Sequence, residues 1–380
     1  MSRVELRSPA RLEIGDGVVV VSAITDDSRL VAEGDLFLLL PRGDSHHLDG
    51  LAGGYLQQAV ERGAAAVVLV GAVAPLEGAA AIPQHSFGTM DEVGIWLRRL
   101  LTDDLHLPTC IGVTGTDGKT SITWMARRAL QRLHGSSWSL GTLGRVTSDE
   151  ECMPLNHTTP PLLVIQHLLA EASVEQVKTL LCEVSSHGIA QQRIAGVPFT
   201  VALWSSIGRD HLQDHGGMDR YVELKASFMR RVVAQGGVAV ANADHALLVT
   251  ALEGVRQRLF WYGRQMGSQL GDQRGDATAD RCLYWRSLAV DRVELQYGGV
   301  STVVEGAPVA EFHHENLAAA AALLLHGKFA ELAQLPQLLS EVGEPPGRMQ
   351  MVAEGVFIDY AHTPEALAAL LASARRLCAG

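Results

Sequence analysis

Residues 110–121 read Cys-Ile-Gly-Val-Thr-Gly-Thr-Asp-Gly-Lys-Thr-Ser, and this stretch decides the fold class. An apolar run leads into a loop with two glycines, and a lysine and a threonine then open a helical segment. Gly115 and Gly118 let the backbone turn its N–H groups inward around phosphate oxygens. Lys119 adds a cation for the β- and γ-phosphates, and the Thr120 hydroxyl can ligate Mg²⁺. The pattern predicts a phosphate-binding loop between a strand and a helix.

This loop departs from the general phosphate-loop pattern at one position. That pattern has a glycine five residues before its second glycine, and this sequence has Val113 there. The match is instead to a tighter variant, Thr-Gly-Thr-Asp-Gly-Lys-Thr, that begins at Thr114. The alternative interpretation is an ordinary strand-to-helix turn with a surface lysine.

Strand-like and helix-like segments alternate along the chain. Residues 35–40 and 64–70 are almost continuously apolar, as strands buried on both faces are, and residues 54–62 between them have a helical pattern. Residues 282–312 alternate and are interrupted by glycines, which predicts antiparallel hairpins at a sheet edge. The expected fold class is α/β, with a mostly parallel central sheet around the phosphate loop.

Two breaks in the pattern predict the domain boundaries. Residues 102–108 are polar and end in proline, and residues 343–347 read Gly-Glu-Pro-Pro-Gly. We therefore expect domains at 1–107 and 108–343. One strand and one helix cannot cover both faces of a sheet, so residues 344–380 are expected to be the incomplete start of a third domain.

Composition excludes several classes of protein. The 380 residues include 31 Lys and Arg and 42 Asp and Glu, which gives a net charge of −11. This negative charge argues against binding to nucleic acids or anionic membranes. No apolar run approaches the ~20 residues needed to cross a bilayer. Five scattered cysteines without a Cys-x-x-Cys pair are typical of a reduced cytoplasmic protein.

Candidate metal ligands follow two of the expected strands. Glu183 ends one strand, where a carboxylate is well placed for Mg²⁺, although a helix cap or a surface acid would look the same. His211 follows the strand 199–204, but a lone histidine is more often structural. Lys225 falls in an expected helix, where a lysine is most often solvated.

A third loop has the character of an anion- or sugar-binding site. Residues 156–160 read Asn-His-Thr-Thr-Pro before a helix, and the helix-forming stretch 191–196 places Gln191 and Arg193 near the same edge. Each signal is weak alone. Their common position at strand ends of a phosphate-loop domain makes them candidates for substrate binding.

The motifs together resemble those of the Mur ligases, ATP-dependent enzymes that form peptide bonds in cell-wall synthesis. The resemblance is strongest to the members that add the third amino acid to UDP-N-acetylmuramoyl-L-alanyl-D-glutamate. The matching motifs occur in the same order as in the family and cover nearly the whole chain. Outside the phosphate loop these motifs are Asp27-Ser28-Arg29 with Gly34-Asp35-Leu36-Phe37, Gly141-Thr142-Leu143-Gly144, His157-Thr158-Thr159-Pro160, Glu183–Arg193, Arg209–Gly216, Asn242-Ala243-Asp244, Gly347-Arg348-Met349 and Asp359–Leu367.

The resemblance implies a role for each candidate. Lys119, Glu183, His211 and Lys225 would be catalytic. Thr120, Glu183 and His211 would bind Mg²⁺, and Lys225 would be carbamylated. The remaining roles form two sets. The UDP-muramoyl-dipeptide would be held by Ser28, His157, Thr158, Thr159, Ser185, Gln191 and Arg193. ATP would be held by Gly115, Thr116, Asp117, Gly118, Lys119, Thr120, Ser121, Asn316, Arg348 and Asp359.

The implied reaction phosphorylates the D-glutamate side chain with ATP, and the amine of diaminopimelate or lysine then attacks the acyl phosphate. A cytoplasmic monomer is expected. Several positions depart from the family pattern: His157 and His313 each replace an asparagine, and Ser205-Ser206 replace a Thr-Asn pair. Because the expected third domain is incomplete, two alternatives stay open, a form that binds both substrates without turnover and a module that binds partner proteins.

Overall fold

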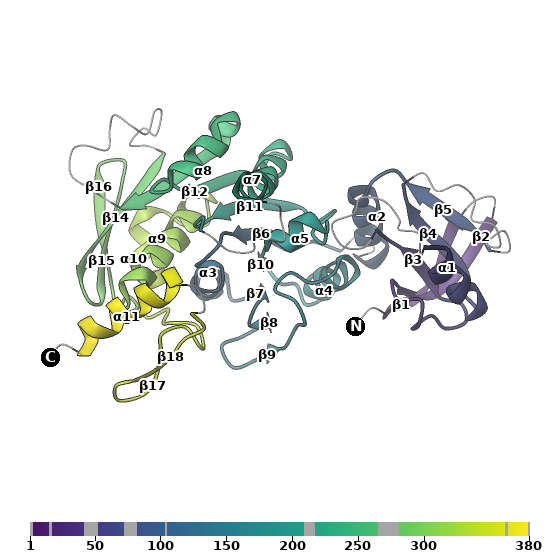
Figure 1. Cartoon of the computed structure of the whole chain (residues 1–380), viewed down its shortest axis with the longest axis horizontal. Helices are drawn as coiled ribbons and strands as arrows, with labels where there is room; N and C mark the ends of the chain where they lie inside the picture. Colours follow the sequence, from purple (N-terminus) through teal and green to yellow (C-terminus); the bar gives the residue numbers. More distant parts are fainter. Residues whose placement is uncertain are drawn as a thin grey trace. The chain divides into compact units, whose positions relative to one another are not determined.

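The computed structural model describes residues 3–14, 17–41, 52–71, 82–102, 105–208, 217–264, 281–361 and 364–378. The chain packs as two compact units (Figure 1). Unit 1 comprises Met1–Pro108, Thr159–Gln176 and His187–Pro198. Unit 2 comprises Thr109–Thr158, Val177–Ser186 and Phe199–Gly380. The division into domains at residues 107 and 343 stays a prediction.

Unit 1 is built on a sheet of order β1-β2-β3-β4-β5 in the described residues. The first two strands pair antiparallel and the others are parallel. The strands are β1 (Arg3–Ile14), β2 (Gly17–Thr25), β3 (Leu36–Leu39), β4 (Ala66–Val70) and β5 (Gln84–Phe87).

Alternating side chains of β3 and β4 supply two separate cores. Leu36 and Leu38 pack on the side of α2 (Met90–Thr102), and Phe37 and Leu39 pack on the side of α1 (Ala52–Glu61). The period of two expected for a strand covered on both faces is therefore present. The helix predicted over 54–62 is confirmed as α1, two residues earlier at its start.

Unit 1 also holds the segment that carries two substrate candidates. Helix α4 (Leu162–Val174) packs on α2. Gly94 of α2 lies against the backbone of Ala195 and Gly196. A Cβ at Gly94 would be 2.3 Å from the carbonyl oxygen of Ala195. The helix predicted over 191–196 is wrong: α5 (Ser186–Ala190) ends before it, and Gln192 adopts a left-handed φ of 52° that no α-helix continues.

Unit 2 contains a larger sheet, of order β16-β15-β14-β13-β12-β11-β6-β10-β7-β8-β9 in the described residues. The strands from β14 to β7 are parallel, and each end of the sheet finishes in antiparallel hairpins. The bounds are β6 (Thr109–Thr114), β7 (Ser137–Gly141), β8 (Gly144–Val146), β9 (Cys152–Met153), β10 (Thr179–Glu183), β11 (Phe199–Trp204), β12 (Val238–Asn242), β13 (Leu259–Arg264), β14 (Cys282–Ala289), β15 (Arg292–Tyr297) and β16 (Val300–Glu305). The predicted α/β class and the edge hairpins within 282–312 are confirmed.

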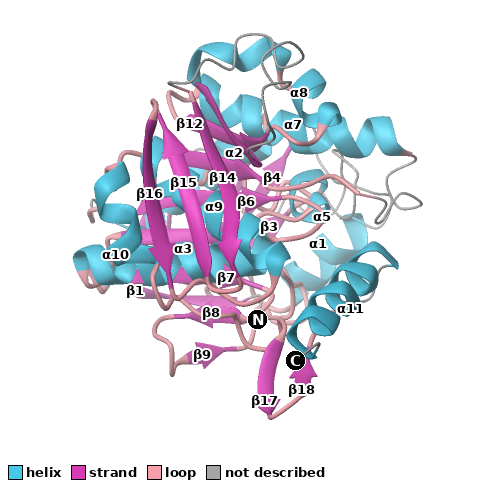
Figure 2. Cartoon of the chain, turned by 90° about the vertical axis from the view of Figure 1, so that its left-hand side faces the viewer, coloured by secondary structure: helices cyan, strands magenta, loops and turns pink. Residues whose placement is uncertain are grey.

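Helices cover both faces of this sheet. On one face α3 (Lys119–His134), α9 (Glu311–His326) and α10 (Leu335–Leu339) enclose the larger core with Ile111 and Val113 of β6. Figure 2 shows α9 behind β14 to β16. On the other face α7 (Met218–Ala234) sets Phe228 against Gly112, where a Cβ would lie 2.5 Å from the Phe228 ring. The bounds of α8 are Ala246–Ala251, and two 3₁₀ helices span Glu253–Arg258 and Leu332–Gln334.

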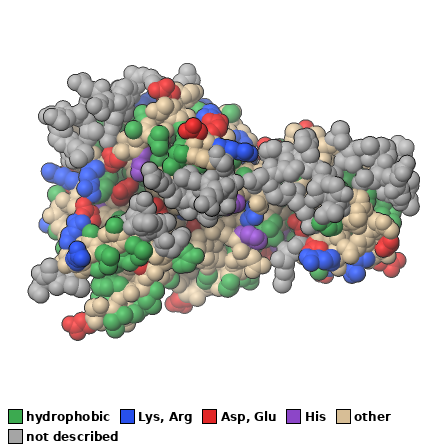
Figure 3. Space-filling model, viewed as in Figure 1, with side chains coloured by type: hydrophobic (Ala, Val, Ile, Leu, Met, Phe, Trp, Pro, Cys, Tyr) green, Lys and Arg blue, Asp and Glu red, His purple; other side chains and the backbone are tan. Residues whose placement is uncertain are grey.

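The final part of unit 2 is a hairpin and a helix, so the expectation of a single strand there is wrong. β17 (Gln350–Ala353) pairs antiparallel with β18 (Val356–Ile358), and α11 (Pro364–Cys378) follows. Arg376 of α11 forms an ion pair with Glu311 of α9. Exposed apolar side chains gather over this hairpin and helix, visible as green atoms at the lower left of Figure 3. They are Met351, Val352, Val356, Ile358, Tyr360, Leu367 and Leu371.

Among the described residues, Cys110, Cys152, Cys182 and Cys282 form no disulfide bond. Within the described ranges, no helix is both long enough and apolar enough to cross a membrane.

Candidate functional site

The phosphate loop runs from the end of β6 to the first residue of α3. Gly118 has a left-handed φ of 85° and precedes Lys119, so the helix begins without a side-chain cap. At Gly115 a Cβ would lie 1.9 Å from the Ser205 hydroxyl oxygen. Both predicted glycines are therefore required, the first by a close neighbour and the second by its backbone conformation.

Two serines after β11 hold this loop in place. Ser205 Oγ donates to the carbonyl oxygen of Asp117 at 2.6 Å, and Ser206 Oγ accepts the Asp117 N–H at 2.9 Å. The Thr116 N–H donates to the carbonyl oxygen of Ser206 at 3.1 Å. The sequence marked these serines only as departures from a family pattern. Their contacts identify them as the residues that set the loop conformation.

Two lysines share one acceptor in the loop. Lys119 Nζ donates to the carbonyl oxygens of Gly115 and Thr116, at 2.9 and 2.8 Å. Lys225 Nζ donates to the same Gly115 oxygen at 3.0 Å and lies 4.7 Å from the centre of the Tyr221 ring. Lys225 is only 1% exposed, so the interpretation of a merely solvated helix lysine is wrong.

Glu183 lies beside the start of α3, at the end of β10. Its carboxylate accepts a hydrogen bond from Thr120 Oγ1 at 3.0 Å and two from Thr142, through the backbone N–H at 3.0 Å and the hydroxyl at 3.1 Å. Burial raises the pKa of Glu183, which is 2% exposed, while Lys119 and these hydrogen bonds lower it. The alternatives of a helix cap or a surface acid are excluded for this carboxylate.

Gly141 makes room for that carboxylate. A Cβ at Gly141 would lie 2.0 Å from Oε1 of Glu183. In the sequence, residues 141–144 serve only as one motif of the family resemblance, which predicts no role for Gly141 or Thr142. Both stand at the carboxyl end of the parallel strand β7, but the sequence does not show that β7 lies beside β10, which carries Glu183.

The ATP-binding candidates outside the loop are joined by contacts that begin at α9. His313 is fully buried, and burial lowers its pKa to about 4, so the imidazole is neutral with one donor nitrogen and one acceptor nitrogen. Its Nε2 lies 3.3 Å from the carbonyl oxygen of Arg348 and its Nδ1 lies 3.4 Å from Nδ2 of Asn316. Asn316 Oδ1 lies against Gly118, where a Cβ would be 2.6 Å away.

Asp359 fixes the segment that carries Arg348. Its carboxylate accepts the N–H groups of Met349 and Ala361, both at 2.6 Å, and the Arg348 guanidinium lies 4.9 Å from the centre of the Tyr360 ring. Asn316 therefore contacts the phosphate loop directly. The backbone of Arg348 is linked to Asn316 through His313, and Asp359 accepts a hydrogen bond from the backbone of Met349, next to Arg348.

A buried carboxyl group lies next to Asn316. Asn242 Nδ2 donates to Oε1 of Glu315 at 2.7 Å. Burial and the nearby charge of Asp244 raise the pKa of Glu315 to about 7, against the hydrogen bond from Asn242. Sequence reasoning assigned no role to Glu315.

The substrate candidates are divided between the units. In unit 1, Ser28 is 2% exposed and donates to Gln58 at 2.6 Å. Arg193 Nη1 donates to the carbonyl oxygen of Thr159 at 2.9 Å, and Arg193 Nε donates to Gln191 at 2.9 Å, so these three residues cluster.

In unit 2, Thr158 Oγ1 lies 3.2 Å from Thr142 Oγ1, which links Thr158 to the Glu183 group. His157 is exposed and Ser185 is half-buried, both in the same unit. His211 lies outside the described residues. Within the described ranges, no group of three His, Cys, Asp or Glu side chains is arranged to hold a metal ion.

The sequence of this chain is similar to those of known proteins. Residues 113–324 match the model of the Mur ligase middle domain. The chain is 32% identical over 376 residues to the UDP-N-acetylmuramoyl-L-alanyl-D-glutamate–2,6-diaminopimelate ligase of Halalkalibacterium halodurans, covering 97% of this chain and 73% of the relative. It belongs to the Mur ligase family.

Other members of the Mur ligase family agree with this. The enzyme of the same name from Pseudomonas aeruginosa is 31% identical over 387 residues, with 95% of this chain and 73% of the relative covered. A solved structure of a ligase with that name superposes with a TM-score of 0.75 at 26% identity, over 99% of this chain and 74% of its own. The MurF ligase of Thermotoga maritima, solved with ADP, shares the fold: TM-score 0.57 at 19% identity, over 92% of this chain and 74% of its own. The predicted family, a family of ATP-dependent ligases, is confirmed.

Proposed function

We propose that this Mur ligase joins diaminopimelate, or lysine in its place, to the D-glutamate of UDP-N-acetylmuramoyl-L-alanyl-D-glutamate, with an acyl phosphate as intermediate. The supporting observation is that relatives named for the diaminopimelate reaction match along almost the whole chain. The loop, the buried Glu183 and the two lysines supply the chemistry that such a reaction needs.

Positioning and charge neutralisation carry the reaction, because both reacting groups are anionic. The loop N–H groups and the α3 N-terminus would bind the ATP phosphates. Lys119 would exchange its carbonyl acceptors for phosphate oxygens. Thr158, Gln191 and Arg193 would orient the muramoyl-peptide, and the incoming amine would attack the acyl carbon and release phosphate.

Glu183 and Thr120 fit Mg²⁺. Their carboxylate and hydroxyl oxygens lie 3.0 Å apart beside the loop, and oxygen donors with few protein ligands are what Mg²⁺ prefers. When bound, the ion would neutralise the charge that develops on the transferring phosphoryl group. Thr142 would then hold Glu183 in the orientation that presents its oxygens.

Carbamylation of Lys225 is part of the same proposal. Two lysine cations donate to one carbonyl oxygen, and like charges so close repel each other. Attack of the neutral amine on CO₂ forms an N–C bond and releases a proton, which converts Lys225 to an anion facing Lys119. Carbon-13 NMR of the protein in labelled bicarbonate with Mg²⁺ would detect this carbamate, and its absence in the wild type would refute the modification.

Turnover is the decisive test. We expect ADP release and tripeptide formation when the chain is mixed with Mg²⁺, ATP, the UDP-muramoyl-dipeptide and diaminopimelate. Lys119→Met should lower the rate at least about 100-fold, because it removes a charge-assisted contact to the phosphates. Lys178→Met, at an exposed lysine in unit 2, is the matched control. Tight binding of both substrates without product, with either amine, would refute ligase function in this chain.

A further inference from the structure

The turn at residues 191–196 carries two of the substrate candidates, Gln191 and Arg193, and its backbone path is unusual. Gln192 has a φ of 52° and Gly196 has a φ of 70°, so the chain does not continue as a helix. A left-handed φ is unfavourable for a residue that has a Cβ. Such a conformation persists only where the surrounding structure holds it, so the contacts of this turn with its neighbours decide its shape.

Helix α2 holds the end of the turn by both polar backbone groups of Gly196. The Gly196 N–H donates to Oδ1 of Asp91 at 2.9 Å, and Arg98 Nη1 donates to the carbonyl oxygen of Gly196. Asp91 and Arg98 are two helical turns apart, so their side chains stand on one face of α2. One face of this helix therefore binds the donor and the acceptor of a single residue of the turn.

Helix α4 and a close backbone contact fix the same end of the turn. Gln166 is fully buried, and its Nε2 donates to the carbonyl oxygen of Ala195 at 2.8 Å. A Cβ on Gly196 would lie 2.2 Å from the carbonyl carbon of Gly94, so the two backbones touch. All of these residues belong to unit 1. Three side chains and one backbone contact thus give residues 195–196 a single position on α2 and α4.

The Arg193 side chain depends on this backbone for its orientation. The Arg193 N–H donates to the carbonyl oxygen of Gly188 at 2.9 Å, which fixes the beginning of the turn. Among the described residues, three of the five guanidinium N–H groups are used: Nη1 donates to the carbonyl oxygen of Thr159, and Nε and Nη2 donate to Gln191. The side chain is half-buried, so part of it stays in contact with solvent.

We propose that Asp91 and Arg98 are positioning residues for the muramoyl-peptide, because they hold the turn in the shape that orients Gln191 and Arg193. This inference rests on the proposed function, which gives those two residues their ligand. The alternative is that α2 only satisfies buried backbone groups, as any packed turn requires. The two interpretations differ because only positioning makes the effect of Arg98 on substrate binding depend on Arg193.

The first measurement needs no substrate. ¹⁵N NMR of the full chain follows the Arg193 Nε–H group, which is assigned by its loss in Arg193→Met. Its exchange with water reports how firmly the guanidinium is held against Gln191. We expect exchange at least about tenfold faster in Arg98→Met, because the loss of one charge-assisted hydrogen bond frees the end of the turn.

The second measurement is calorimetric binding of the UDP-muramoyl-dipeptide. Arg98→Met should weaken binding about tenfold in the wild-type background and less than about threefold in the Arg193→Met background, because residues that act through one another are not additive. Asp91→Ala should behave like Arg98→Met. Arg98→Lys keeps a donor and Asp91→Asn keeps an acceptor, so both should restore most of the affinity.

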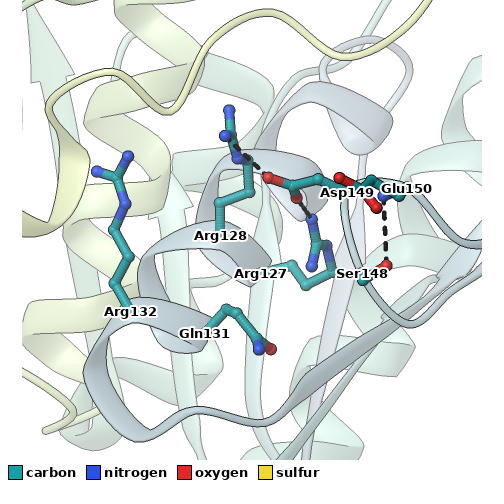
Figure 4. Close-up of a pocket in the computed structure, with 7 residues that line it drawn as sticks. All are labelled: Arg127, Arg128, Gln131, Arg132, Ser148, Asp149 and Glu150. Carbon is teal, nitrogen blue, oxygen red and sulfur yellow. Dashed lines mark hydrogen bonds and ion pairs between the residues drawn. The ribbon is translucent and has the colours of Figure 1, made fainter.

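Two control variants separate positioning from a general loss of stability. Arg99→Met removes an exposed arginine next to Arg98 on the same helix. Arg128→Met, on α3 in unit 2, removes an arginine that also donates to a backbone carbonyl oxygen, that of Val342 (Figure 4 shows Arg128). Neither variant should change the exchange of the Arg193 Nε–H group or the affinity for the UDP-muramoyl-dipeptide.

The outcomes distinguish this inference from the proposed function. Unchanged Arg193 exchange in Arg98→Met would overturn the inference, and so would an equal loss of affinity with and without Arg193. If Arg193→Met binds the dipeptide as tightly as the wild type, the substrate role of the turn is wrong and the inference falls with it. If Arg193→Met weakens binding and Arg98→Met does not, the inference alone is wrong. Asp91→Ala replaces Arg98→Met in both measurements if that variant does not fold.

Discussion

Replacing Gly141 by alanine should disable the ligase while leaving the fold intact. The new Cβ would lie 2.0 Å from Oε1 of Glu183, a distance that real Cβ atoms do not reach, so the carboxylate must move. Gly141 has no left-handed φ, and alanine therefore brings no backbone strain. The perturbation acts almost entirely on one side chain.

The size of the effect follows from what Glu183 would lose. The carboxylate must shift by about 1 Å, and a misplacement of that size can cost roughly 100-fold in rate. Such a shift breaks or lengthens hydrogen bonds from Thr120 and Thr142, each charge-assisted and worth about 1.5–3 kcal/mol. We expect kcat/KM to fall by about 100-fold, and the Mg²⁺ concentration at half-maximal rate to rise.

The assay is ADP release coupled to product mass, at several Mg²⁺ concentrations, with thermal unfolding measured in parallel. Gly254→Ala is the matched control, because nothing lies within 4 Å of its Cβ and its φ is not left-handed. Gly141→Ala with activity within about threefold of wild type, at the same Mg²⁺ optimum, would show that the position of Glu183 does not matter.

Two further predictions concern the same site. Glu315→Gln removes a carboxyl group whose pKa is raised to about 7 in the folded chain. Ionisation of this group lowers the free energy of unfolding of the wild type as pH rises from about 4.5 to 7, and the variant lacks this loss. In urea unfolding the advantage of the variant should grow by about 2 kcal/mol between pH 5 and pH 8. An equal effect at both pH values would contradict the burial argument. Ser205→Ala should raise the KM for ATP about tenfold with kcat nearly unchanged, because it frees the Asp117 carbonyl of the loop, and a fall in kcat alone would contradict that role.

The phosphate loop could be predicted because its signal is local. Strand, glycines, lysine and threonine stand within residues 110–121, and each acts on the backbone next to it. Glu183 could be predicted as a strand-end carboxylate for the same reason. In both cases the sequence contains the residue and its immediate structural context together.

The residues that support the loop could not be predicted, because their roles depend on strand order. Ser205 reaches the loop only since β11 pairs with β6, and Gly141 meets Glu183 only since β7 pairs with β10. No local pattern encodes either pairing. Lys225 is similar: its burial follows from packing of α7 on the sheet face, where Phe228 lies against Gly112.

The order β12-β11-β6-β10-β7 explains why these distant segments converge on one loop. From β6 the chain first builds β7 and β10 on one side, then crosses to add β11 and β12 on the other. A parallel sheet opens a crevice at the carboxyl ends where the direction of addition reverses. That reversal occurs at β6, so Glu183 arrives from one neighbour and Ser205 from the other. The same topology that makes the loop a binding site therefore supplies, from opposite sides, the carboxylate that would hold the metal ion and the hydroxyl that sets the loop conformation.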